Sequence, residues 1–242
     1  MARDRAFSTL SARGQAYRLR ALAYAALPAF AVEPVRVRLI SNHLNGIFRV
    51  DAADGRAYAL RISHPTWRTD ADLETEIAWL VALAAETDVG APVPLPTRDG
   101  ARVTVASAPG VPEPRRCVLF TWLPGVDLIH RLTPTYLSQL GVLAALLHAH
   151  AARFQAPPCL PQRRMDRIYA RGEPDVLFTA TSAAFFTPGT GAIFAAVRER
   201  VDAAFARRYA DPVGLHLIHN DLHQENVKVH QGRLYPLDFE DA

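Results

Sequence analysis

The chain has little lysine and cysteine and no long apolar run, and each shortage excludes a class of function. It holds 27 Lys and Arg residues among 242, yet its only lysine is Lys228. Two cysteines, Cys117 and Cys159, form neither a disulfide framework nor a metal-ligand pair, which favours the cytoplasm. The apolar run 21–32 is too short to span a bilayer, so we expect no membrane attachment. A formal net charge of +3 does not indicate nucleic-acid binding.

The first half of the chain predicts an antiparallel sheet with one helix. Runs rich in β-branched and aromatic residues, several of them alternating, predict strands at 35–40, 46–50, 56–62, 101–107 and 115–123. The dipeptide Asp54-Gly55 predicts a tight hairpin between two of these strands. Apolar residues at helical spacing predict a helix over 70–86.

The pattern changes after Pro124-Gly125, and the chain then reads as mostly helical to about residue 209. Thr133 is a suitable helix cap, and 191–210 is an amphipathic helix. We therefore predict an α+β, two-lobed fold. Residues 1–122 are expected to form a first lobe built on the sheet, and 123–242 a mostly helical second lobe.

The stretch HNDLHQENVKV, residues 219–229, concentrates side chains able to do chemistry. Asp221 and Asn226 stand five apart, which fits the spacing of kinase catalytic loops. The intervening sequence predicts a hairpin that returns Asp238 beside Asn226. Carboxylate and amide oxygens are ligands that Mg²⁺ accepts, so these residues fit phosphoryl transfer.

A zinc site on His219 and His223 is the competing interpretation of the same stretch. It is disfavoured because no Glu occupies the general-base position of an H-E-x-x-H motif. The strand-like run 227–229 also follows at once, where a zinc-binding helix would continue.

The segments LIHNDLHQENVKV and LDFEDA resemble the phosphotransferase family that includes aminoglycoside phosphotransferases, choline kinases and homoserine kinases. The family pattern is H-G-D-x-x-x-x-N followed by I-D-F or I-D-W. This chain has Asn220 where glycine is common and Leu237 where isoleucine is common. The resemblance implies a protein-kinase-like fold, Asp221 as catalytic base or hydroxyl positioner, and Asn226 and Asp238 as Mg²⁺ ligands.

A kinase-like first lobe needs a strand cation for the phosphates and a helical Glu to orient it. No lysine precedes Lys228, so we expect Arg61 in the run YALR to be this cation. Glu76 shares a helix side with Leu80, whereas Glu74 points away, so Glu76 is the expected partner.

Two further nucleotide contacts follow from the resemblance. Asn45 matches an Asn common in the turn that covers the phosphates, and residues 119–125 resemble the interlobe linker. Backbone groups from Phe120 to Trp122 would then meet the nucleobase.

We therefore predict a Mg²⁺-dependent kinase that transfers the γ-phosphate of ATP or GTP to a hydroxyl of a small molecule. Family members usually continue with several helices beyond the point where this sequence stops, four residues after Asp238. A non-catalytic, nucleotide-binding remnant of such a kinase is the alternative.

Overall fold

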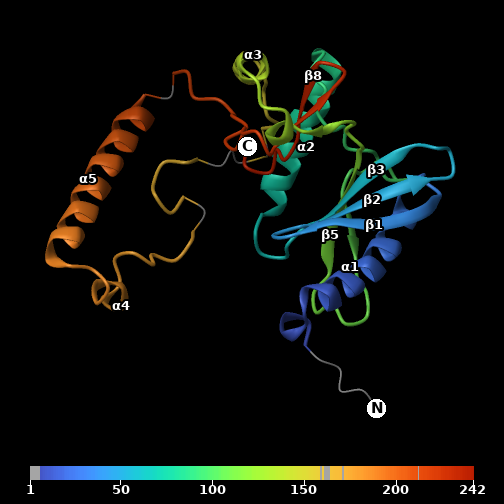
Figure 1. Ribbon diagram of the computed structural model, residues 1–242, viewed down its shortest axis with the longest axis horizontal. Coiled ribbons are helices and arrows are strands. Elements are labelled where there is room, and N and C mark those ends of the chain that lie inside the picture. Colours follow the sequence, from blue (N-terminus) through green and yellow to red (C-terminus); the bar gives the residue numbers. More distant parts are fainter. Residues whose placement is uncertain (1–5, 159, 161–163, 171, 212) are drawn as a thin grey trace. The chain divides into compact units, whose positions relative to one another are not determined.

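The structure is a computed structural model that describes residues 6–158, 160, 164–170, 172–211 and 213–242 (Figure 1). The chain forms two compact units, one of residues 1–161 with 218–242 and one of residues 162–217. The lobe boundary predicted at residue 122 falls inside the first unit and stays a prediction. All of the predicted site residues belong to that first unit.

A five-stranded antiparallel sheet forms the first part of this unit, which confirms the predicted α+β class. Its strands are β1 (Pro34–Asn42), β2 (Gly46–Ala52), β3 (Ala57–Ile62), β4 (Thr104–Ala106) and β5 (Arg115–Thr121). The spatial order is β1-β2-β3-β5-β4, and every neighbouring pair is antiparallel. The crossover places β5 beside β3, so the segment after Thr121 continues from an inner strand of the sheet.

One face of the sheet is covered by helix α1 (Ala12–Ala26), which the sequence analysis did not predict (Figure 1). Short 3-10 helices, η1 (Phe7–Thr9) and η2 (Leu27–Ala29), flank it. The side chain of Ser11 accepts a hydrogen bond from the backbone of Gly14 and caps the helix. Leu22 is fully buried in the core that α1 shares with the strands.

Helix α2 (Asp70–Glu86) has the bounds that the apolar spacing predicted. A capping box fixes its start, because the Thr69 side chain accepts from the Asp72 backbone while the Asp72 side chain accepts from Thr69. The first turn of the helix is followed by an apolar side on which Trp79 and Leu80 are fully buried. The helix is therefore held by both its cap and its apolar side.

The remaining elements of the first unit surround the predicted catalytic loop. They are β6 (Val126–Asp127), η3 (Leu128–Arg131), α3 (Pro134–Ala151), β7 (Val227–His230) and β8 (Arg233–Pro236). The three strands form a small antiparallel sheet in the order β6-β7-β8. Gly125 has φ +95°, and a Cβ there would lie 2.1 Å from the carbonyl oxygen of Val229. Only glycine therefore lets the linker approach β7 this closely.

The second unit contains α4 (Ala180–Ala183) and α5 (Pro188–Ala210). The prediction of a mostly helical segment is wrong for the described residues before α4, where 164–170 and 172–179 contain no helix. The carboxylate of Asp175 there accepts hydrogen bonds from the backbone of Leu177 and Phe178. These bonds replace helical ones, so a turn is favoured. Across the described ranges, no helix has the length and apolar character required to traverse a bilayer.

Candidate active site

The loop between the second unit and β7 holds Asp221 and Asn226 together through their side chains. The Asn226 amide donates to Asp221 Oδ2 at 2.7 Å and to the Asp221 carbonyl oxygen at 3.0 Å. Because the Nδ2 group makes both bonds, the Oδ1 atom of Asn226 is not used in its contact with Asp221. The two residues thus form one unit with a carboxylate and an amide oxygen.

The β7–β8 hairpin returns the chain to this unit. Its turn uses left-handed backbone at Gln231 (φ 49°) and Gly232 (φ 77°). Beyond β8, the Leu237 backbone N–H donates to the Asn226 carbonyl oxygen at 2.9 Å. Asp238 is therefore the next residue along from a backbone contact with Asn226.

Two polar residues of the site have left-handed backbone, Asn220 with φ 62° and Asp238 with φ 64°. Asn and Asp tolerate this region better than other non-glycine residues. The conformation at Asn220 gives a physical reason why glycine is common at this position in the related sequences. Strained backbone thus occurs directly before Asp221 and at Asp238 itself.

His219 supports the loop from behind. Its Nε2 donates to the Leu237 carbonyl oxygen at 3.0 Å, and its ring lies 4.5 Å from that of Phe239, centroid to centroid. Burial lowers the pKa of His219, although hydrogen bonding to Leu237 and the charge of Asp221 act the other way. No group of three His, Cys, Asp or Glu residues able to hold a metal occurs in the described part of the chain.

Arg61 of β3 and Glu76 of α2 form a bidentate ion pair. Arg61 Nη1 lies 2.8 Å from Glu76 Oε1, and Nη2 lies 2.5 Å from Oε2. Burial alone would lower the pKa of Arg61, but the charge and hydrogen bonds of Glu76 raise it above its usual value. The guanidinium also lies over the ring of Phe120, 5.2 Å from its centroid. Glu74, which the helix period excluded, is exposed.

Asp238 is set among other carboxylates. Desolvation raises the pKa of Asp238 to about 7, and the charges of Glu240, Glu76 and Asp241 act in the same direction. Arg61 opposes them and lowers it, so the cation of β3 and the carboxylate of the hairpin are electrostatically coupled. The Asp238 side chain still reaches solvent. An exposed carboxylate with surplus negative charge around it, one residue beyond the backbone contact of Leu237 with Asn226, suits a divalent cation.

Asn45, in the turn between β1 and β2, connects the end of β3 with the acidic tail that follows Asp238. Its Oδ1 accepts from the backbone of His64 at 3.0 Å, and its Nδ2 donates to the carboxylate of Glu240. Arg68 reaches the same tail, through the Glu240 carbonyl oxygen and an ion pair with Asp241. Sequence reasoning missed Glu240 and Asp241, although the acidic run directly after Asp238 was a visible signal.

Phe120 and Trp122 occupy the predicted linker. Phe120 is buried, whereas the ring of Trp122 faces the guanidinium of Arg49 at 4.7 Å and the amine of Lys228 at 5.4 Å. The Trp122 backbone N–H donates to Ala57 at 3.3 Å, so it already has an acceptor in the sheet. A nucleobase donor would therefore have to come from beyond Trp122.

Helix α2 also connects Arg61 with the segment that follows Asp238. Trp79 lies one helical turn after Glu76, and its ring meets that of Phe239 at 5.4 Å in an edge-to-face contact. Its indole N–H donates to His150 of α3 at 3.0 Å. The helix that orients Arg61 thus also contacts the residue that follows Asp238.

Solved structures with the same architecture are small-molecule kinases. A microcompartment-associated aminopropanol kinase is 22% identical, with a TM-score of 0.64 over 96% of this chain and 70% of that one. Amicoumacin kinase hAmiN, in complex with AMP-PNP, Ca²⁺ and Ami, is 19% identical, with a TM-score of 0.67 over 96% of this chain and 64% of that one. At these identities, the likeness shows the fold alone.

The match to relatives found by sequence covers only part of the length of those relatives. An uncharacterized protein of Deinococcus radiodurans is 32% identical over 191 residues, which are 79% of this chain and 52% of that protein. An uncharacterized protein of Synechocystis sp. is 38% identical over 98 residues, or 40% of this chain and 26% of that protein. The chain thus matches about half and about a quarter of these two relatives.

The phosphotransferase enzyme family matches residues 36–242, from β1 through the catalytic loop to the acidic tail. The match includes the loop with Asp221 and Asn226, the hairpin that leads to Asp238, and the ion pair of Arg61 with Glu76. With this match over most of its length and a kinase-like fold, the chain belongs to the phosphotransferase enzyme family.

Proposed function

We propose that this chain is a cytoplasmic kinase that transfers the γ-phosphate of ATP or GTP to a hydroxyl group of a small molecule. The observation that carries the proposal is the hydrogen-bonded pair of Asp221 and Asn226 beside Asp238. A carboxylate for the attacking hydroxyl and two oxygens for a cation are the parts that phosphoryl transfer requires.

In this proposal, Asp221 orients the acceptor hydroxyl and accepts its proton. Asn226 holds Asp221 in place through the 2.7 Å bond, so the carboxylate keeps one orientation. The reaction moves a phosphoryl group between two oxygens, and positioning supplies most of its acceleration.

Asn226 and Asp238 would hold Mg²⁺, which neutralises charge on the phosphates when it is bound. The donor set fits this ion, because both residues offer hard oxygens and the acidic surroundings of Asp238 favour a cation. Arg61 would contact the phosphates while Glu76 fixes its plane. Its buried Nε has no hydrogen-bond partner in the described structure, so it is a donor still to be satisfied.

The nucleobase would lie against the linker. Because the Trp122 N–H already donates to Ala57 in the sheet, we expect the Leu123 N–H to donate to the base. Phe120, whose ring lies under the guanidinium of Arg61, would limit the depth of the site. Asn45 would act by holding the phosphate-covering turn against Glu240 rather than through its own oxygen, which is already bonded to His64.

The proposal is tested by transfer of radiolabelled γ-phosphate from ATP and from GTP onto a panel of amino alcohols, aminoglycosides and other hydroxyl compounds. We expect Mg²⁺-dependent labelling of at least one acceptor. Calorimetric titration with a non-hydrolysable nucleotide runs beside it. Nucleotide binding without transfer to any acceptor would favour the alternative, a nucleotide-binding remnant. Failure of both binding and transfer would refute the nucleotide site itself.

Replacing Asp238 by Asn should stabilise the metal-free protein and at the same time remove its response to Mg²⁺. The pKa of Asp238 in the folded protein, about 7, exceeds the ordinary value of 3.8. The stability gained from its protonation is therefore complete only below about pH 4 and is lost as the pH rises through 7. Above pH 7 the Asn variant carries no charge at this position. It therefore avoids the desolvation of the carboxylate and its repulsion by the neighbouring acidic residues. Because the side chain is exposed and solvent screens its charge, we expect a gain of only about 1 kcal/mol.

The measurement is the thermal midpoint of both proteins in EDTA at pH 5 and pH 8. Asn tolerates the left-handed backbone of position 238, so strain does not confuse the comparison. A variant that is less stable than the parent at pH 8, or that still gains stability from Mg²⁺ with nucleotide, would contradict the assignment.

A further inference from the structure

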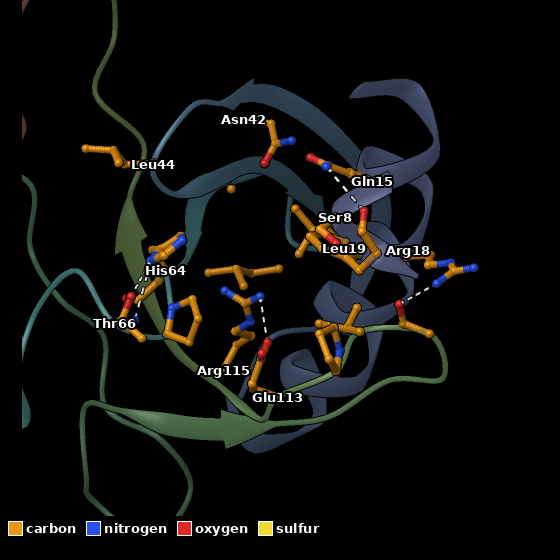
Figure 2. Close-up of a pocket in the computed structure, with 18 of the residues that line it drawn as sticks. Ser8, Gln15, Arg18, Leu19, Asn42, Leu44, His64, Thr66, Glu113 and Arg115 are labelled. Carbon is orange, nitrogen blue, oxygen red and sulfur yellow. Dashed lines mark hydrogen bonds and ion pairs between the residues drawn. The ribbon is translucent and has the colours of Figure 1, made fainter. Parts of the chain in front are cut away.

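A cavity of about 880 Å³ lies on the α1 side of the five-stranded sheet, away from the proposed catalytic residues (Figure 2). Its size is within the range of ligand pockets, roughly 300–1,000 Å³. Its walls come from the start of the described chain, α1, the β1–β2 turn, the end of β3 and the segment before β5. None of the catalytic-loop residues lines it.

Strand alternation places Arg115, which lines this cavity, on the opposite face of the sheet from Arg61. Arg115 shares its face of β5 with Cys117 and Leu119, which belong to the core beneath α1. Arg61 pairs in register with Val118 and projects to the other face, toward Glu76. The sheet thus carries one buried arginine on each face.

The two buried arginines differ in how their charges are compensated. Arg61 has two short bonds to a buried carboxylate. Arg115, 7% exposed, has one 3.2 Å ion pair with Glu113, whose side chain is 52% exposed, and its guanidinium lies 5.9 Å from the ring centroid of Phe7. Burial lowers the pKa of Arg115, with Glu113 and Cys117 only partly opposing it. A buried cation with a weak, solvent-facing partner gains from a further anion.

The charges around the cavity favour an anion with one negative charge. Arg18 lies in the wall, where its Nη1 donates to the Gly110 carbonyl oxygen at 2.7 Å. Burial and the charge of Arg115 lower the pKa of His64, although the charge of Glu113 acts the other way, so a second positive charge is disfavoured there. The Arg18 guanidinium is already engaged with Gly110, so the ligand is assigned to the buried Arg115 alone, which suits a single negative charge.

The rest of the wall is largely apolar. Figure 2 shows the guanidinium of Arg115 among the lining side chains, next to Glu113, with Leu19 of α1 on the far side. Phe7, Ile62 and Val111 add to the apolar surface. We propose that this cavity binds a small monocarboxylate, with its anionic head on Arg115 and its apolar body between α1 and the sheet. The site does not include the proposed catalytic residues, although the β1–β2 turn that carries Asn45 forms part of its wall.

The experiment measures calorimetric and thermal-shift binding of 3-phenylpropionate, its neutral amide and inorganic phosphate to the full chain. We expect the carboxylate to bind, and Arg115→Met to weaken its affinity by about 10-fold or more, as for loss of a charged hydrogen bond. Arg116→Gln is the matched control. It removes an arginine from the same strand whose ion pair is with Asp70, outside the cavity. Its contact with the cavity wall is a long hydrogen bond, 3.5 Å, to the Pro65 carbonyl oxygen, so affinity should stay within about twofold.

A second variant keeps the proposal testable if Arg115→Met does not fold. Ser8→Trp adds bulk at an exposed position of the cavity wall while Arg115 stays in place, and it should abolish binding. Equal affinity for the amide, unchanged affinity in Ser8→Trp, or no binding of the carboxylate would overturn the proposal. Phosphate binding in place of carboxylate binding would overturn the choice of ligand. Loss of phosphoryl transfer in Asp221→Asn with carboxylate binding retained is the expected sign of two separate sites.

Discussion

Replacing Asp221 by Asn should lower kcat by about 10²- to 10⁴-fold, the usual contribution of a positioned general base. The exchange keeps the shape of the side chain and an oxygen that can still accept from Asn226, so the loop should hold its conformation. We therefore expect nucleotide affinity to stay within about twofold. Single-turnover transfer of γ-phosphate and calorimetric titration with a non-hydrolysable nucleotide measure the two effects separately.

Glu225→Gln is the matched control, because it removes a carboxylate from the same loop at an exposed position. Its kcat should remain close to that of the parent protein. Equal turnover in the Asp221→Asn variant would show that another group handles the acceptor hydroxyl. Loss of nucleotide binding along with turnover would instead indicate that Asp221 supports the loop rather than the chemistry.

Removing the carboxylate of Glu76 should cost about 3–5 kcal/mol of unfolding free energy, because Glu76→Ala leaves the charge of Arg61 buried and unpaired. Both side chains are under 10% exposed, at 8% and 5%, so water cannot replace the lost partner. Urea denaturation measures the change. Glu74→Ala, on the same helix but exposed, should change stability by no more than about 0.5 kcal/mol.

A double variant separates the structural from the catalytic role of this pair. Arg61→Met with Glu76→Leu replaces a buried ion pair by apolar side chains of similar length, which is often neutral or stabilising. We expect it to recover most of the stability lost in Glu76→Ala yet to keep a high KM for nucleotide. Full activity in the double variant would contradict a contact between Arg61 and the phosphates.

Local patterns in the sequence predicted much of this structure. The helix period over 70–86 distinguished Glu76 from Glu74, and the turn at Gln231-Gly232 gave the hairpin that leads to Asp238. These features depend on residues close in sequence, where backbone preference and spacing decide the outcome. The roles of the site residues in catalysis stay predictions.

Features that depend on distant segments were not predictable in this way. Helix α1 covers the sheet only because its apolar side meets strands that form later in the chain. The contact of Asn45 with Glu240 joins residues 195 positions apart, and the cavity beside Arg115 likewise needs several remote segments. No local signal marks such pairs, because tertiary contacts select them.

The left-handed backbone at Asp238 restricts which residues this proposed metal position tolerates. Glutamate conserves the charge, but its longer side chain is disfavoured at φ 64°, whereas Asn and Gly fit the backbone and carry no charge. No single one of these substitutions therefore keeps both the backbone conformation and the negatively charged side chain. A homologue with any residue other than aspartate here would be expected to have lost its cation while keeping its fold.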